Sequence, residues 1–178
     1  MNNKKILRLK KLINFYNLDG YVVPKNDAYF SEFASPDRLK TISNFSGSAG
    51  FAVIFKKKNF LFVDGRYTIQ AKIQAGKYFQ IIEIPKFSIK KILKKFKKKL
   101  SIGFDPQLFT NATLKKKFND ICDLLPITEN LIDRIYKGKG RTFVNPFYTL
   151  DDKITGESMT SKISRLIKII KGKKIDNI

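Results

Sequence analysis

Apolar residues recur along this chain with two different periods, and the alternation between the two predicts a layered fold. Between residues 6 and 16 they return every three or four positions, which is the spacing of one face of an α-helix. Residues 21–23 form a short apolar run that is typical of a buried strand. The runs 51–55 and 60–63 are rich in aromatic and β-branched residues and are separated by a short polar stretch, so they predict an antiparallel hairpin.

Helical and strand-like segments continue to alternate after this hairpin. Apolar residues have helical spacing over residues 67–75, 87–100 and 111–122, and strand-like runs lie at residues 78–84 and 102–104. Helical crossovers join parallel strands, whereas a hairpin joins antiparallel ones. The sequence therefore predicts an α/β fold in which helices flank a mixed β-sheet.

The pattern changes after residue 136, and this change predicts the domain organisation. Turn-forming and charged residues without periodicity occupy residues 137–156, which we interpret as a linker after a first domain of residues 1–136. Helical spacing returns over residues 158–171.

This last segment repeats the first one. Arg8-Leu9 and Asp19-Gly20 match Arg165-Leu166 and Asp176-Asn177 at one constant spacing, with apolar residues between them in both copies. We therefore expect residues 157–178 to be the start of a second, related domain, cut off where its first strand would begin.

Charge adds a second hypothesis to this picture. Thirty-six Lys and Arg residues against 15 Asp and Glu residues give a formal net charge of +21, which is typical of proteins that bind nucleic acid or anionic surfaces. In the densest block, however, Ile89, Leu93 and Phe96 have helical spacing and the lysines lie between them. This spacing favours a solvated helix face, and a stand-alone basic binding module is the alternative.

The residues available for chemistry are few. The chain has no histidine, the commonest general base and transition-metal ligand, and its acidic residues are scattered. The single cysteine, Cys122, has apolar neighbours that favour a structural role on a half-buried helix face. We therefore predict no catalytic residue and no metal ligand in this chain.

Membrane insertion and secretion are not expected either. The apolar runs are far shorter than the roughly 20 residues that span a bilayer, and lysines interrupt the amino-terminal segment where a secretion signal would be continuously apolar. We expect a cytoplasmic protein.

The most distinctive stretches are residues 27–33, 38–50 and 60–67. Gly47-Ser48-Ala49-Gly50 leads into a predicted strand, whereas a phosphate-binding loop leads into a helix, so this turn is not expected to hold a nucleotide. Asp64-Gly65-Arg66 is compatible with a capped turn that carries a surface arginine. From the residues alone, Glu32 and Arg38 are equally compatible with surface charges.

Together these stretches resemble the N-terminal domain of the aminopeptidase P and creatinase family, most closely the long, three-domain Xaa-Pro aminopeptidases. The matching residues are Asp27-Ala28, Ser31-Glu32-Phe33, Arg38, Asn44-Phe45-Ser46-Gly47-Ser48-Ala49-Gly50, Asp64-Gly65-Arg66-Tyr67, Gln70-Ala71, Asp105-Pro106 and Glu129-Asn130-Leu131-Ile132-Asp133. Their order and approximate spacing hold from about residue 5 to residue 135. The resemblance implies a ribonuclease H-like mixed sheet flanked by helices.

The resemblance also implies a function. Enzymes of this family release an N-terminal residue that precedes proline, using water activated between two divalent metals, usually manganese, which are held in a C-terminal pita-bread domain. By this resemblance, the chain is the non-catalytic N-terminal domain, which shapes substrate access and supports association into a homodimer. Its partners would be the pita-bread domain and, in the whole enzyme, proline-containing peptides.

Individual residues acquire expected roles from the same resemblance. Glu32 would pair with the substrate's α-amino group, and Arg38 and Arg66 would brace the turn and the helix start through carboxylates such as Asp64. Tyr29 stands where long family members often have a histidine, so a polar role at that position does not carry over to this chain.

Overall fold

The first part of the chain folds around one mixed β-sheet. The computed structural model describes residues 2–31, 33–118, 120–136 and 148–173. The chain divides into two units, residues 1–139 and residues 140–178. Among the described residues of the first unit, the sheet has six strands in the order β4-β3-β2-β1-β5-β6. Their bounds are β1 Gly20–Pro24, β2 Phe51–Phe55, β3 Asn59–Asp64, β4 Gln80–Ile84, β5 Ser101–Phe104 and β6 Asp123–Pro126.

The directions of the strands confirm the predicted mixed sheet. β1 and β2 pair antiparallel, with Val22 opposite Val53, and β2 and β3 form the predicted hairpin, with Val53 opposite Phe60. The pairs β3·β4, β1·β5 and β5·β6 are parallel. β2 therefore runs opposite to the other strands of this sheet.

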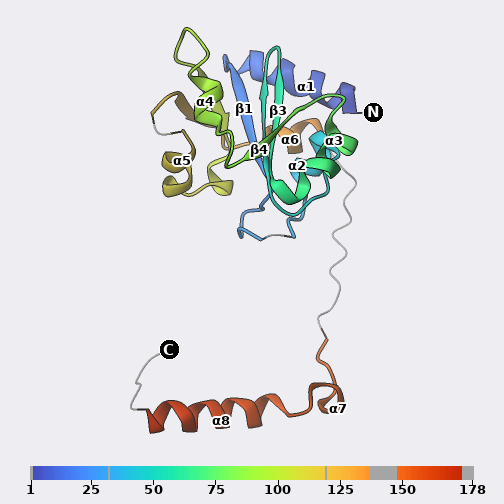
Figure 1. Cartoon of the computed structure of the whole chain (residues 1–178), viewed down its shortest axis with the longest axis vertical. Helices are drawn as coiled ribbons and strands as arrows, with labels where there is room; N and C mark the ends of the chain where they lie inside the picture. Colours follow the sequence, from blue (N-terminus) through green and yellow to red (C-terminus); the bar gives the residue numbers. More distant parts are fainter. Residues whose placement is uncertain (1, 32, 119, 137–147, 174–178) are drawn as a thin grey trace. The chain divides into compact units, whose positions relative to one another are not determined.

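Alternating residues of the strands fill two separate hydrophobic cores. Tyr21 and Val23 point into one core, and Val22 between them points into the other, as the period of a β-strand requires. Helices cover both faces (Figure 1). The first face is covered by α1 Asn2–Phe15, α2 Arg38–Ser43, α3 Thr68–Ala75 and α6 Leu131–Ile135, and the second by α4 Ile89–Leu93 and α5 Asn111–Phe118.

Two predicted helices are shorter in the structure. The lysine-rich helix covers only Ile89–Leu93 instead of residues 87–100, because like charges three and four positions apart disfavour a longer helix. Lys98 and Lys99 instead form ion pairs with Asp19 and Asp123. The chain beyond Leu93 therefore forms turns and bends before β5 begins.

The helix predicted over residues 111–122 also ends early, at Phe118. Asp120 has a φ of 58°, a left-handed conformation that a helix cannot continue through. Cys122 therefore lies outside the helix and is buried just before β6, so the half-buried helix position predicted for it is wrong.

The second unit contains two helices among its described residues, α7 Asp152–Thr155 and α8 Met159–Gly172. The helix expected over residues 158–171 is confirmed, and the Ser158 hydroxyl caps it by accepting from the Ser161 N–H. The predicted linker lies outside the described residues over 137–147, and α7 occupies part of the remainder. No helix among the described residues is long and apolar enough to cross a membrane.

Candidate functional site

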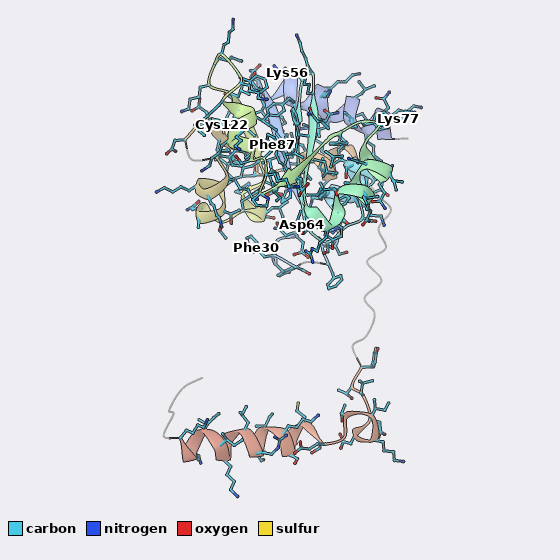
Figure 2. The ribbon with its side chains drawn as sticks, in the orientation of Figure 1. Phe30, Lys56, Asp64, Lys77, Phe87 and Cys122 are labelled. Carbon is cyan, nitrogen blue, oxygen red and sulfur yellow. The ribbon has the colours of Figure 1, made fainter. Side chains whose placement is uncertain are left out.

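The distinctive sequence segments meet at one edge of the sheet. β1, β3 and β5 run in the same direction; Asp64 is the last residue of β3, and Asp27 and Asp105 follow the carboxyl ends of β1 and β5. The turn before β2 reaches the same edge because β2 runs the other way. Figure 2 shows Phe30 and Asp64 at this end of the first unit and Lys56 at the other end. We call the end that carries Asp64 the carboxyl edge.

The turn before β2 is shaped by two glycines. A Cβ at position 47 would overlap Phe45 Cζ and lie 2.9 Å from Tyr67 Cδ1. Gly50 has a φ of 152°, and a Cβ there would lie 2.7 Å from the Phe62 carbonyl oxygen. The backbone of this turn therefore approaches the rings and β3 more closely than any side chain would allow.

Tyr67 joins this turn to the segment after β3. Its ring meets the fully buried Phe45 ring edge-on at a centroid distance of 5.7 Å, and its hydroxyl is hydrogen-bonded to the Ser48 hydroxyl at 2.8 Å. Gln74 of α3 adds a second link, because its Oε1 accepts from the Ser46 N–H and its Nε2 donates to Ser46 Oγ, each at 2.9 Å. The turn and the start of α3 thus form one connected structure.

Asp64 caps the short helical turn η1 Gly65–Tyr67 that precedes α3. Its Oδ1 accepts from the Arg66 N–H at 2.9 Å, and its Oδ2 accepts from Arg66 Nη2 at 2.8 Å. These bonds from Arg66 hold the pKa of Asp64 below its ordinary value. The carboxylate is therefore ionised and occupied with its own turn, as a bracing role for Arg66 requires.

Arg38 has a different carboxylate partner. Its Nε and Nη2 donate to both oxygens of Asp133 at 2.7 to 3.1 Å, which joins α2 to α6 across 95 positions of sequence. The Arg38 side chain is only 14% exposed. Arg38 thus pairs with Asp133 rather than with Asp64.

Asp27 organises the loop after β1. Its Oδ1 accepts from the backbone N–H groups of Tyr29 and Ser31 at 3.0 Å each. The bond from Ser31 holds the pKa of Asp27 below its ordinary value. The loop presents aromatic rings outward, since Tyr29 is 92% and Phe33 86% exposed. Glu32, the predicted substrate-proximal residue, lies outside the described residues.

Asp105 anchors the other side of the edge. It is buried, and its Oδ1 caps the short turn η2 Pro106–Leu108 while its Oδ2 accepts from Asn130 Nδ2 at 2.7 Å. Asn130 in turn caps α6 through the Ile132 N–H. The Asp105-Pro106 pair is a helix-start signal that the sequence carries, whereas its contact with Asn130 needs the fold.

A cavity of about 360 Å³ opens at this edge. It lies between the segment after β1 and the segment after β5, where the order of the strands in the sheet reverses and ligands commonly bind. Asn26 Nδ2 spans the two segments and donates to the Leu108 carbonyl at 3.0 Å. Lys117 lies over the Phe51 ring at 4.2 Å, and burial lowers its pKa. Arg66, Ser48 and Gly50 of the predicted motif line the same cavity.

The arrangement favours positioning and contact over catalysis. Asp27, Asp64 and Asp105 are each occupied with hydrogen bonds inside the domain. Within the described ranges, no group of three or more His, Cys, Asp or Glu side chains lies close enough to hold a metal. Burial raises the pKa of the Cys122 thiol to about 11, so it is not an activated nucleophile. What the edge offers outward is a cavity and exposed rings.

Comparisons with known proteins identify the fold. The family model described as the Creatinase/Prolidase N-terminal domain matches residues 5–135. The probable Xaa-Pro aminopeptidase P of Coprinopsis cinerea is 32% identical over 92% of this chain, and the Xaa-Pro aminopeptidase 2 of Rattus norvegicus is 32% identical over 91% of it. The chain spans 28% and 25% of the lengths of these two relatives.

Solved structures agree with this match. The X-prolyl aminopeptidase of Caenorhabditis elegans, described as a cytosolic enzyme with a di-nuclear active site, superimposes with a TM-score of 0.74 at 26% identity and covers 99% of this chain. This chain covers 32% of that one. An Xaa-Pro aminopeptidase structure from Streptococcus thermophilus shares the fold at 22% identity, with a TM-score of 0.59 over 75% of this chain.

Proposed function

Because the chain belongs to the Creatinase/Prolidase N-terminal domain family, we propose that it acts as the non-catalytic N-terminal domain of a metal-dependent Xaa-Pro aminopeptidase. The observation that carries this proposal is the pattern of coverage. The match to the Coprinopsis relative includes 92% of this chain but only 28% of the relative. The function of the domain is therefore exercised together with a larger catalytic part.

The side chains that the structure describes do not provide the ligands that the metals of such an enzyme require. A di-nuclear site is described for the Caenorhabditis enzyme, and two divalent ions require several converging carboxylate or histidine ligands. This chain has no histidine, and the three aspartates at the carboxyl edge are engaged in capping and loop bonds. We assign the metal pair, with manganese as the expected ion, to a C-terminal pita-bread domain.

The carboxyl edge supplies the contact surface in this proposal. Its turn is held rigidly by Phe45, Gly47 and Tyr67, while the loop after β1 exposes Tyr29 and Phe33. Exposed aromatic side chains are typical of surfaces that meet another protein part. We propose that this edge narrows the entrance to the catalytic site, that Glu32 there pairs with the α-amino group of a proline-containing peptide, and that the domain supports homodimer formation.

The proposed cellular location rests on the description of the Caenorhabditis structure. The Caenorhabditis enzyme is described as cytosolic, and we propose the cytoplasm for the enzyme that contains this domain.

A domain exchange tests the proposed function. Residues 1–173 of this chain would replace the matching segment of the Caenorhabditis X-prolyl aminopeptidase, and hydrolysis of an Xaa-Pro peptide would be measured for the chimera, the intact enzyme and a version that lacks the segment. We expect the chimera to retain metal content and measurable turnover, and the shortened version to lose turnover. Equal activity of the shortened version and the intact enzyme would contradict the proposal.

A further inference from the structure

The amino-terminal end of the strands, opposite the carboxyl edge, carries a groove that the proposed function does not use. The groove has a volume of about 500 Å³ and lies between the β2–β3 hairpin turn and the segment that follows α4. Figure 2 shows Lys56 of this hairpin at the end of the unit far from Asp64. Its rim carries Lys56, Lys57, Lys58, Lys95 and Lys98.

Aromatic rings form the floor of this groove. The Phe55 and Phe96 rings lie 5.5 Å apart between centroids, and the Phe55 and Phe60 rings lie 5.8 Å apart edge to face. Phe55 and Phe60 are only 4% and 6% exposed, whereas Phe96 is 41% exposed. The floor is therefore apolar, and Phe96 is the one of these three aromatic residues that is exposed.

A second cavity adjoins this groove and extends along β4. We call the groove and the second cavity the two hollows. The second cavity has a volume of about 660 Å³ and shares Lys58, Phe60, Ile92 and Lys95 with the groove as lining residues. Four consecutive residues of β4, Gln80 to Glu83, form one of its walls. β4 is an edge strand of the sheet and crosses the front of the domain in Figure 1. Its outer N–H and C=O groups pair with no other strand of the described chain.

The charges around the two hollows are unbalanced. Lys98 and Lys86 pair with Asp19 and Glu83. Lys58, Lys72 and Lys95 also line the hollows, and their ammonium groups form no ion pair with any carboxylate in the part of the chain that the structure describes. A ligand that places carboxylates here gains attraction without breaking an existing pair.

We propose that the two hollows bind an extended acidic peptide, which pairs with the outer edge of β4 and places carboxylates against Lys58 and Lys95. An open strand edge accepts main-chain hydrogen bonds from a polypeptide, the mode known as β-strand addition. The apolar side chains that alternate with the acidic ones then point to the other face of the sheet, where Ile81 of β4 packs against the first core. Single-stranded nucleic acid fits less well, because it needs several stacking faces and has no peptide groups to pair with β4.

A fluorescent heptapeptide of alternating acidic and β-branched residues, Glu-Val-Asp-Ile-Glu-Val-Asp, tests the proposal by fluorescence anisotropy. We expect saturable binding to the whole chain, about tenfold weaker binding to the K58E/K95E variant, and less than about twofold change for the K115E/K116E variant, which makes the same charge change on α5. All four lysines are exposed, so circular dichroism should show the same fold in both variants.

Two further probes separate the proposed mode from general charge attraction. A peptide of the same sequence that is N-methylated on its three central residues keeps its charge but cannot pair with β4, and we expect it to lose binding. Equal affinity of this peptide, or of an oligothymidine with the same number of charges, would overturn the proposal. So would lysine-dependent self-association of the chain in sedimentation, because a second copy would then occupy the edge. The test is independent of peptidase function.

Discussion

The requirement for glycine at position 47 comes from two neighbouring aromatic rings rather than from an unusual backbone conformation. Replacing it with alanine places a methyl group against Phe45 Cζ and 2.9 Å from Tyr67 Cδ1, where both rings are held by their own edge-on contact. We expect the Gly47→Ala variant to lose about 1–3 kcal/mol in the free energy of unfolding, as overpacked sites do. Urea denaturation of the first unit measures this loss.

Gly65→Ala is the matched control in the same motif. A Cβ at position 65 would meet the Glu83 carboxylate oxygen at 3.3 Å, and the end of that side chain can move aside. We expect a much smaller loss for this variant. Equal losses for the two glycine variants would show that the rings do not set the requirement at position 47.

Asp27 links the stability of its loop to pH. Backbone donation from Ser31 holds its pKa below the ordinary value, so the ionised form is favoured in the folded chain. The stabilising contribution is present above the unfolded-state pKa of about 3.9 and is lost as the pH falls through the lower folded-state value. We therefore expect the wild type to exceed Asp27→Asn in unfolding free energy at pH 7 and the difference to shrink below about pH 4. A constant difference across urea titrations from pH 7 to pH 2.5 would contradict this linkage.

Among the secondary-structure elements, the strands of the sheet follow most directly from the sequence. Five of the six strands are predicted as apolar runs, because most of their residues are apolar and pack into one of the two cores. β6 escaped prediction because its residues are largely exposed and it ends at Pro126. The short helices α2 and α6 contain too few apolar residues for periodicity, but Asp37 and Asn130 carry the capping signals that mark their starts.

The candidate site was predictable as a set of segments but not as a set of contacts. Asp64 and Arg66 are two positions apart, so a capped turn could be read from their local sequence. The partners Arg38 and Asp133 lie on different helices, and only the packing of α2 against α6 brings them together. Neither charge patterning nor spacing specifies such a pair when the chain offers 36 cations and 15 acids.

The helices α1 and α8 differ in how much of their apolar surface is buried. Ile6, Leu9 and Ile13 of α1 are buried in the first core, whereas no residue of α8 is buried. A helix of this length gains little stability without packing. We therefore expect amide hydrogens of α8 to exchange far faster than those of β1 and β2, measured by hydrogen–deuterium exchange and mass spectrometry on the whole chain. Equal protection of α8 and β2 would mean that α8 shares the cooperative unfolding of the sheet, against the interpretation of residues 157–178 as the start of a separate domain.

The large positive charge and the two apolar cores occupy separate places in the molecule. The sheet and its helices enclose two cores, while lysines surround them on the hairpin turn, on α5 and on the segment after α4. The net charge of +21 thus describes the solvated surface rather than a catalytic centre. In the two hollows, part of this charge lies beside an apolar floor.

In the part that the structure describes, the isolated chain lacks the groups that metal-dependent peptide hydrolysis requires. A water molecule that attacks a peptide bond needs activation by a metal or a general base, and this chain has no histidine and three internally bonded aspartates at its candidate site. We expect the purified chain to bind no stoichiometric manganese, cobalt or zinc at micromolar concentrations, measured by calorimetry. We also expect no release of the first residue from an Xaa-Pro peptide, with or without added manganese. The intact Caenorhabditis enzyme under the same conditions is the positive control. Turnover by the chain that persists after rigorous removal of host aminopeptidases would place catalytic residues in this domain and overturn its assignment as non-catalytic.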